Sequence, residues 1–335
     1  MDDVKYLDAE SVFSALSPAE AVDALTRVLA AGFDPEDDIP RTIRDVSAGN
    51  MIMMPAEIGD WVGVKLVGVA VRNAELGLPR IQGQYLMYDS RTMTLRAILD
   101  GTALTTLRTP AVSVAAVRPA FSRFTDPVRL VVFGAGPQGI GHVDTLAAVL
   151  DVGLAEATFV VRHPDRVDAV VRERGRVLRA GSAEVDAALA AADIVVTATT
   201  ARTPLFSAEL VRPGAVVLAC GSHDPDAREL PGGLMRSATV VVESMSTVLR
   251  EGGDVVLAIQ EGALDAESLV TMKQFTAAEA PAPEDRTVVF KGSGMSWEDL
   301  AVATTIVERA TGEHESAGGE PVSAATERAS AGERP

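Results

Sequence analysis

The apolar positions in the first hundred residues change from a helical period to the short runs that are typical of strands. Apolar residues recur at helical spacing from Val22 to Leu29, and Ser17-Pro18-Ala19-Glu20 predicts a capping box at the start of this helix, which Gly32 ends. Short apolar runs between turn residues predict strands over 51–54, 61–71, 81–88 and 95–99, and the Ala- and Val-rich stretch 105–119 predicts a helix. We therefore expect a mostly antiparallel sheet layered with helices.

From Val128 onward, apolar strands alternate with helical segments. The expected strands cover 128–133, 157–161, 193–198, 215–219 and 239–242, and the expected helices cover 138–150, 166–174 and 183–191. Continuous apolar strands that alternate with helices are typical of a parallel sheet covered on both faces. The apolar helix expected at 301–309 has no strand of its own, so we expect it to pack back on the first part of the chain.

Composition narrows the classes of function. The chain of 335 residues has a net charge of −17, which argues against nucleic-acid binding because that requires a basic face. We expect no signal peptide at the start, and no run reaches the ~18–20 apolar residues of a membrane span. The single cysteine, Cys220, lies in an apolar run and fits a buried thiol in the reducing cytoplasm. The histidines lack metal-ligand spacing, so we expect no metal site: His142, His163, His223 and His314.

A glycine-rich loop follows the strand 128–133 and opens the next helix. Its sequence is Gly134-Ala135-Gly136-Pro137-Gln138-Gly139, the spacing of a dinucleotide-binding loop in the context that gives this spacing its meaning. Gly134 permits the tight turn, Gly136 lets the backbone approach a pyrophosphate, and Gly139 allows close packing of strand and helix. The first N–H groups of the helix would then bind the phosphates. The alternative is a glycine-rich turn without a ligand.

The end of the next strand bears on the choice between the two nicotinamide cofactors. NAD enzymes usually have an acidic residue there for the ribose 2′-hydroxyl, whereas this chain has Arg162-His163-Pro164-Asp165-Arg166. Arg162 and Arg166, with His163 between them, favour NADP over NAD because a guanidinium accommodates a 2′-phosphate. Ordinary surface charges are the alternative.

The strand 193–198 ends in small hydroxylated residues. Thr197, Ala198 and Thr199 would lie at the carboxyl end of a parallel strand, where ligands bind in doubly wound sheets, so we expect the threonines to face the dinucleotide. Turn formation alone also explains these threonines.

Several segments together resemble the ornithine cyclodeaminase/mu-crystallin family, in order from about residue 39 to residue 303. They are Gly63-Val64-Lys65, Asn73 with Gly77-Leu78-Pro79, Leu99-Asp100-Gly101, the run from Leu104 to Ala111, the glycine loop with Gln138 and His142, Ala219-Cys220-Gly221-Ser222-His223 with Arg228-Glu229-Leu230, and Phe290-Lys291-Gly292-Ser293-Gly294-Met295 with Glu298-Asp299.

The resemblance implies an α/β fold with two domains. A Rossmann-type doubly wound parallel sheet at 119–299 would be joined to a discontinuous α+β substrate and dimerisation domain, formed by 1–118 with 300–312. The remaining tail, 313–335, lacks periodicity and is predicted to be disordered. Family members are usually homodimers, and they exchange hydride between nicotinamide and the α-carbon of a small amino or imino acid. Further candidate cofactor contacts in or beside the matched segments are Arg80, Thr109, Gly221, Ser222 and Gly294; Arg80 replaces a small hydroxylated residue, and its side chain is alternatively solvated.

Three cations match family positions that hold the substrate carboxylate next to the amine: Arg41, Lys65 and Arg108. A guanidinium binds a carboxylate bidentately, and a lysine of lowered pKa exchanges a proton with an amine or imine. The alternatives are that Lys65 points outward from its strand, that Arg108 forms a structural salt bridge, and that Arg44 takes the place of Arg41.

Two departures from the family pattern bear on the reaction. His223 stands where cyclodeaminases have an aspartate, and Ile52 stands where they tend to have an acid, so carboxylates that would hold a second amine are missing. We therefore expect an imine (ketimine) reductase or amino-acid dehydrogenase, with Lys65 or His223 as the proton donor. His223 alternatively bridges a turn with Asp224 and Asp226. The other functions are a redox-neutral cyclodeaminase that releases ammonia, and a non-catalytic protein that binds NADP and a small ligand.

Overall fold

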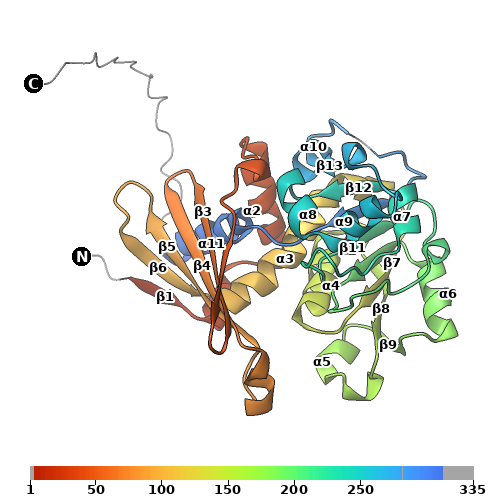
Figure 1. Ribbon diagram of the computed structural model, residues 1–335, viewed down its shortest axis with the longest axis horizontal. Coiled ribbons are helices and arrows are strands. Elements are labelled where there is room, and N and C mark those ends of the chain that lie inside the picture. Colours follow the sequence, from red (N-terminus) through yellow and green to blue (C-terminus); the bar gives the residue numbers. More distant parts are fainter. Residues whose placement is uncertain (1–3, 281, 312–335) are drawn as a thin grey trace, which may run out of the picture.

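A computed structural model of the protein describes residues 4–280 and 282–311; the predicted disordered tail, 313–335, lies outside these residues. The chain has the expected α/β architecture, with two sheets that lie side by side and helices packed on and between them (Figure 1). The glycine loop, the lysine and the arginines that the sequence singled out are therefore distributed over two halves of the molecule.

The first sheet has six strands in the order β1-β6-β5-β4-β3-β2, and all neighbours are antiparallel except β1 and β6. This confirms the mostly antiparallel sheet. Its strands are β1 (Lys5–Leu7), β2 (Thr42–Val46), β3 (Gly49–Ile58), β4 (Trp61–Val69), β5 (Ile81–Asp89) and β6 (Leu95–Asp100). Its helices are α1 (Ala9–Ala15), α2 (Pro18–Ala30), α3 (Gly101–Val117) and α11 (Ser296–Thr311), with 3₁₀ turns at Pro35–Asp37, Val71–Leu76 and Arg118–Arg123.

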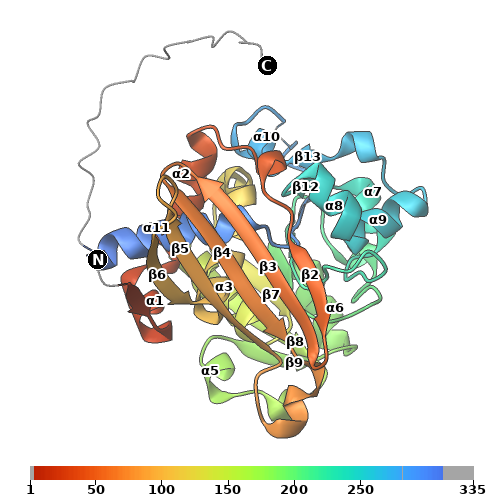
Figure 2. The same ribbon diagram turned by 60° about the vertical axis from the view of Figure 1, so that its left-hand side comes forward.

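One face of this sheet is covered by helices. Lys65 on β4 is paired with Met54 on β3 and Tyr85 on β5, and all three side chains are buried on the face that α3 and α11 cover. In Figure 2 the opposite face of β3, β4 and β5 has no described helix in front of it. Because side chains alternate along a strand, this placement decides that Lys65 points inward rather than to solvent.

The second sheet has eight parallel strands in the order β13-β12-β14-β11-β10-β7-β8-β9. They are β7 (Val128–Phe133), β8 (Leu154–Val161), β9 (Arg176–Arg179), β10 (Ile194–Thr197), β11 (Val216–Ala219), β12 (Thr239–Val242), β13 (Val270–Thr271) and β14 (Val288–Lys291). The helices are α4 (Pro137–Val149), α5 (Ala169–Arg172), α6 (Ala183–Ala191), α7 (Gly232–Ser237), α8 (Met245–Glu251), α9 (Gly253–Gln260) and α10 (Met272–Thr276), with 3₁₀ turns at Pro164–Arg166, Ala208–Leu210 and Ala266–Ser268. The predicted helix 166–174 is wrong in extent: only the single turn α5 is helical, and β9 follows it.

Helix α3 joins the two halves. It contacts β4, β5 and β6 of the first sheet, β11 and β14 of the second, and helices α2, α4 and α11. Most of its residues are buried, which explains why the sequence is apolar all round rather than along one stripe. Arg108 is thereby carried on a helix with almost no solvent-exposed face.

Helix α11 follows β14 and returns to the first half, where it packs on β3, β4, α2 and α3. This confirms the expected return of the C-terminal helix, although it begins at Ser296, five residues before the predicted start at 301. The carboxylate of Asp38 accepts hydrogen bonds from the backbone N–H groups of Ser296 (2.8 Å) and Trp297 (3.0 Å) and so caps the helix. Among the described residues, no helix is both long and apolar enough to cross a membrane.

Candidate functional site

The glycine loop has the geometry of a phosphate cradle. Gly134 has φ of +105°, and a Cβ there would stand 2.5 Å from the carbonyl oxygen of Ala198; a Cβ on Gly139 would collide with the carbonyl of Gly134. Gly136, by contrast, is exposed, and a Cβ there would meet no atom within 4 Å. Gly136 is also the N-cap of α4, and because glycine has no side chain, no side-chain cap satisfies the first N–H groups of that helix. These residues fit a dinucleotide pyrophosphate.

The glycine loop lies at the point where the strand order of the second sheet reverses. Strand β7 pairs with β8 on one side and with β10 on the other, and all three run parallel, so their carboxyl ends meet at one edge. Within the loop, Ala135 is half-buried and Pro137 opens α4. The Gln138 side-chain amide donates to the carbonyl oxygen of Thr105 on α3 (3.3 Å), which ties the loop to the other half of the molecule.

The structure brings Arg162, His163 and Arg166 to this edge. All three are exposed just beyond β8, whose pairing with β7 runs as far as Phe133 with Val160. The backbone carbonyl of Arg162 accepts a hydrogen bond from Arg179 (3.2 Å), which fixes the turn but leaves the Arg162 guanidinium in solvent. Asp165 lies in the turn before Val167 and does not begin α5, which starts after Asp168.

The hydroxyls of the threonines at the end of β10 bond to a buried carboxylate, whereas a Cβ on Gly134 would stand 3.5 Å from the methyl carbon of Thr199, so their role at the dinucleotide stays a prediction. The hydroxyl of Thr197 is fully buried and donates to Glu229 (3.0 Å), and the hydroxyl of Thr199 donates to the same carboxylate (2.7 Å). Ala198 between them is half-buried. The physical reason is that a buried carboxylate needs donors, and these hydroxyls provide them.

Lys65, Arg108 and Asp299 come together in the interior between the halves. The Nζ atom of Lys65 is 2.6 Å from Oδ2 of Asp299, and Nε of Arg108 is 3.3 Å from Oδ1 of the same carboxylate. Lys65 is 3% exposed, Arg108 5% and Asp299 0%. Burial lowers the pKa of Lys65 to about 8, and Arg108 adds to this, while Asp299 opposes it by stabilising the ammonium. One carboxylate thus holds two cations from different segments.

Further carboxylates surround Arg108. Its Nη1 pairs with Glu298, and although burial alone would lower the arginine pKa, the charges of Asp299, Glu298 and Glu243 raise it. Burial and the nearby Glu243 raise the pKa of Glu298 well above its usual range. A Cβ on Gly294 would stand 2.8 Å from Nη1 of Arg108, so Gly294 packs against the guanidinium, and its N–H donates to Glu243 (3.1 Å). The predicted salt-bridge alternative for Arg108 is therefore realised in this structure.

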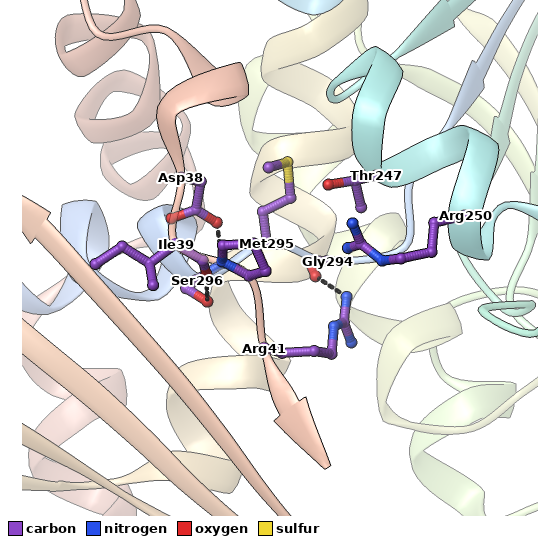
Figure 3. A pocket seen from close by; sticks show the side chains of 9 residues that line it. Asp38, Ile39, Arg41, Thr247, Arg250, Gly294, Met295 and Ser296 are labelled. Carbon is purple, nitrogen blue, oxygen red and sulfur yellow. Dashed lines mark hydrogen bonds between the residues drawn. The ribbon is translucent and has the colours of Figure 1, made fainter.

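Arg41 lies beside the same loop, on the edge of a small pocket between the halves (Figure 3). Its Nη2 donates to the carbonyl of Gly294 (2.5 Å) and pairs with Glu251 (2.9 Å). The pocket has a volume of about 10 Å³, room for about one water, and its lining is Asp38, Ile39, Pro40, Arg41, Thr247, Arg250, Gly294, Met295 and Ser296. The rival, Arg44, is exposed on edge strand β2.

His223 is exposed in the loop that follows β11. Desolvation by surrounding protein lowers the pKa of its imidazole, Asp224 opposes this shift, and the positive charges of Arg41 and Lys291 add to it. Asp224 and Asp226 pair with Arg202 (3.5 and 2.6 Å), so they do not form the turn bridge to His223 that was one alternative. His223 is therefore an exposed imidazole of lowered pKa in the loop after β11.

The remaining candidate site residues lie in the loop after β11, on α3 and just before β5. Ser222 is buried and its hydroxyl donates to the carbonyl of Ala227 (2.6 Å), while the Gly221 N–H donates to Glu229 (2.9 Å). Thr109 is half-buried on α3, and its carbonyl accepts from Ser113 (3.0 Å). Arg80 is exposed beyond the 3₁₀ turn 71–76, where its backbone carbonyl accepts from Ala70 (2.9 Å). Burial raises the pKa of the Cys220 thiol to about 12, which supports a structural thiol.

The residues that sequence reasoning missed are mostly buried carboxylates. Asp299, Glu298, Glu243, Glu229 and Asp254 are each at most 3% exposed, and Lys291 is 1% exposed. The available signal was charge next to apolar runs: Glu298 and Asp299 directly precede the run Leu300–Ala303, and Lys291 ends an apolar strand. Among the described residues, no group of histidines, cysteines and carboxylates is arranged to hold a metal ion.

Comparison with known proteins identifies the family. The model of the ornithine cyclodeaminase/mu-crystallin family matches residues 6–314, so the chain belongs to this family. It is 28% identical over 313 residues to ketimine reductase mu-crystallin of Mus musculus, covering 90% of this chain and 96% of that protein. It is 32% identical over 274 residues to the Delta(1)-pyrroline-2-carboxylate reductase of Paracoccus denitrificans, covering 79% and 86%.

A solved structure agrees with this assignment. The Delta(1)-pyrroline-2-carboxylate reductase of Thermococcus litoralis, in complex with NADH and L-proline, has a TM-score of 0.81 and 25% identity to this chain. The match covers 92% of this chain and 98% of the other. The sequence-based assignment to the family, and the fold that it implied, are thus confirmed.

Proposed function

We propose that the protein is a nicotinamide-dependent reductase of small α-imino acids, which adds hydride to the α-carbon of a C=N bond. The observation that carries the proposal is the buried Lys65–Asp299–Arg108 cluster, whose helix α3 packs on α4 and is hydrogen-bonded to Gln138 of the phosphate cradle. The reductases named above, which share this fold, support it. When bound, the nicotinamide dinucleotide supplies the hydride.

Arg108 and Arg41 are suited to a carboxylate. Of the Arg108 guanidinium, Nε contacts Asp299 and Nη1 contacts Glu298, whereas Nη2 has no protein partner in the described chain. Because Asp299 and Glu298 hold the guanidinium from one side, its remaining donors keep a fixed direction, which reduces the entropy lost on binding. Arg41, on the other side of Gly294, adds a second positive charge.

Lys65 is suited to proton transfer. Its ammonium is held by Asp299 and contacts the hydroxyl of Thr105 (3.4 Å), so its position is defined before any substrate enters. With a pKa of about 8 it is mostly protonated at neutral pH and yet gives up its proton more readily than an ordinary lysine. In the reductive direction Lys65 donates the proton to the substrate nitrogen while hydride goes to the α-carbon, and the product is an amine.

The missing acids favour reduction over cyclodeamination. Ile52 is a half-buried aliphatic side chain on β3, and His223 has a lowered pKa. Neither offers a carboxylate to a cationic δ-amine, so a neutral or cyclic side chain is the better substrate. A redox-neutral cyclodeaminase would instead release ammonia without net consumption of cofactor.

The reduction should depend on pH through Lys65. With Δ¹-pyrroline-2-carboxylate and NAD(P)H, we expect kcat/KM for reduction to fall as the pH rises through about 8, because the ammonium form is lost above the lowered pKa. The arginine of the Lys65→Arg variant stays protonated, so the residual activity of this variant should show no fall in kcat/KM near pH 8. The surface variant Lys5→Arg should still show that fall. Ammonia release from ornithine without cofactor consumption would contradict the proposal. So would an unchanged fall in kcat/KM near pH 8 in Lys65→Arg.

We further propose that NADP is preferred over NAD. Arg162 and Arg166 are exposed beside the carboxyl end of β8, where the adenosine ribose lies in doubly wound folds, and no acidic residue occupies position 162. A guanidinium there would pair with a 2′-phosphate and has no such partner on NAD.

The Arg162→Ala variant tests this preference. We expect the KM for NADPH to rise by about tenfold, the loss of one charge-assisted phosphate contact, with the KM for NADH unchanged. The control is Arg129→Ala, which removes an exposed arginine from the opposite, amino end of β7. Equal changes for both cofactors, or none, would overturn the preference.

A homodimer is the third part of the proposal. The face of the first sheet that has no helix in front of it (Figure 2) is the side of Val64 and Leu66, opposite to Lys65. Its adjacent strands carry partly or fully exposed apolar side chains, among them Met51, Met53, Val64, Leu66 and Leu86. A contiguous apolar face is typical of an interface, and a second copy can cover it by two-fold symmetry.

Light scattering after size-exclusion chromatography tests the dimer. We expect the wild type to have twice the chain mass and Leu66→Asp to be monomeric, because the buried charge would be unpaired at the interface. Leu76→Asp is the matched control, since Leu76 is 72% exposed in the 3₁₀ turn Val71–Leu76 and not on a strand of this sheet. A dimer that survives Leu66→Asp would place the interface elsewhere.

A further inference from the structure

A second buried charge cluster lies beneath the loops that follow β10 and β11, and the proposed reaction does not use it. It consists of Glu229, Asp254 and Lys291, whose exposed fractions are 0%, 0% and 1%. Burying two carboxylates and an ammonium carries a large desolvation cost, even when they are paired. Their hydrogen bonds indicate what the cluster does.

Glu229 accepts hydrogen bonds from two separate loops. Oε1 accepts from the backbone N–H (2.8 Å) and the hydroxyl (2.7 Å) of Thr199. Oε2 accepts from the hydroxyl of Thr197 (3.0 Å) and the backbone N–H of Gly221 (2.9 Å). One carboxylate therefore fixes the end of β10 to the end of β11.

Asp254 and Lys291 fix Glu229 in turn. Oδ1 of Asp254 accepts from the backbone N–H groups of Glu229 (2.7 Å) and Leu230 (2.8 Å). Nζ of Lys291, at the end of β14, is 3.2 Å from Oδ2 of Asp254 and donates to the carbonyl oxygen of Ser222. The cluster thus links the carboxyl ends of three adjacent parallel strands.

The two loops are held in close contact. A Cβ on Gly221 would collide with the backbone of Thr199 and would stand 2.6 Å from Oε1 of Glu229. The loop after β10 also supplies the carbonyl of Ala198 that faces Gly134 in the phosphate loop. A shift of Thr199 would therefore be transmitted to both the loop at Gly221 and the phosphate loop at Gly134.

We propose that Glu229 is the positioning residue for the nicotinamide half of the bound dinucleotide. This rests on the proposed function. A dinucleotide with its phosphates at α4 and its adenosine ribose beside β8 extends on the other side of the switch point over β10 and β11. The edge it meets there is formed by the loops that Glu229 holds, and α3, which carries Arg108, contacts β11 and β14.

The Glu229→Gln variant tests the proposal. Glutamine keeps the side-chain shape but replaces one acceptor oxygen with an amide NH₂ donor. This donor faces the two donors of Thr199 if it takes the place of Oε1, or those of Thr197 and Gly221 if it takes the place of Oε2. We expect NADPH to bind about tenfold more weakly, as followed by its fluorescence, because a lost acceptor leaves buried donors unpaired. In the free protein, amide hydrogen exchange should accelerate at 199 and 221. With saturating NADPH, the KM for the imino acid should stay unchanged.

Glu261→Gln is the matched control. Glu261 pairs with Arg228, the neighbour of Glu229, but its side chain is 49% exposed and this ion pair does not involve Thr197, Thr199 or Gly221. NADPH binding should be unchanged in this variant. Fluorescence and hydrogen exchange are measured without turnover, so they decide the role of Glu229 even if the protein reduces no imine.

The outcomes are separable. Unchanged NADPH binding and unchanged exchange in a folded Glu229→Gln protein would overturn the proposal, as would an equal loss of affinity for NADPH and the imino acid. If Glu229→Gln does not fold, Thr197→Val decides, because it removes a single hydroxyl donor with little change in shape. A roughly threefold weaker NADPH affinity in Thr197→Val supports the proposal, and wild-type affinity contradicts it.

Discussion

The site depends on one buried carboxylate that pairs with two cations. Asp299 contacts Lys65 through one oxygen and Arg108 through the other, with all three side chains at most 5% exposed. Without Asp299, a lysine and an arginine would lie side by side in a medium of low dielectric, where like charges repel and each ion has lost its hydration. With it, both cations keep their charge and have defined positions.

This pairing also explains the chain topology. Lys65 lies on β4, Arg108 on α3 and Asp299 in the first turn of α11, so the cluster joins a strand to two helices, of which α3 also contacts the second sheet. Helix α11 leaves the second sheet after β14 and begins where Asp38 caps it, which sets the position of Asp299. Because α3 contacts both sheets and α4, Arg108 and the glycine loop are held by the same helix.

The sequence was sufficient for the elements whose apolar pattern is long and regular. Strands β7 and β12 match their expected bounds, and the capping box at Ser17 is present as predicted. Short or mixed segments were missed: β9 is Arg-Val-Leu-Arg, and β1 has three residues, so neither shows a period. The glycine loop was predictable from its spacing, and within the buried charge cluster only the cations were, since their family positions could be matched. Asp299 lies 234 positions from Lys65 in the sequence, and Glu229 lies 32 positions from Thr197. These partners therefore become evident only when the fold brings them together.

The thermodynamic coupling between Lys65 and Asp299 tests the account most directly. Urea unfolding of Lys65→Met, Asp299→Asn and the double variant would measure it, with the exposed Arg91–Asp60 pair as the reference. We predict that Asp299→Asn alone lowers the free energy of unfolding by about 3–5 kcal/mol. In the double variant the loss of unfolding free energy should be smaller than the sum of the two single losses by more than about 1 kcal/mol, and this difference is the coupling energy. For the exposed Arg91–Asp60 pair the coupling energy should be about 0–1 kcal/mol. Additive losses at Lys65 and Asp299 would contradict the claim that this carboxylate holds the site together.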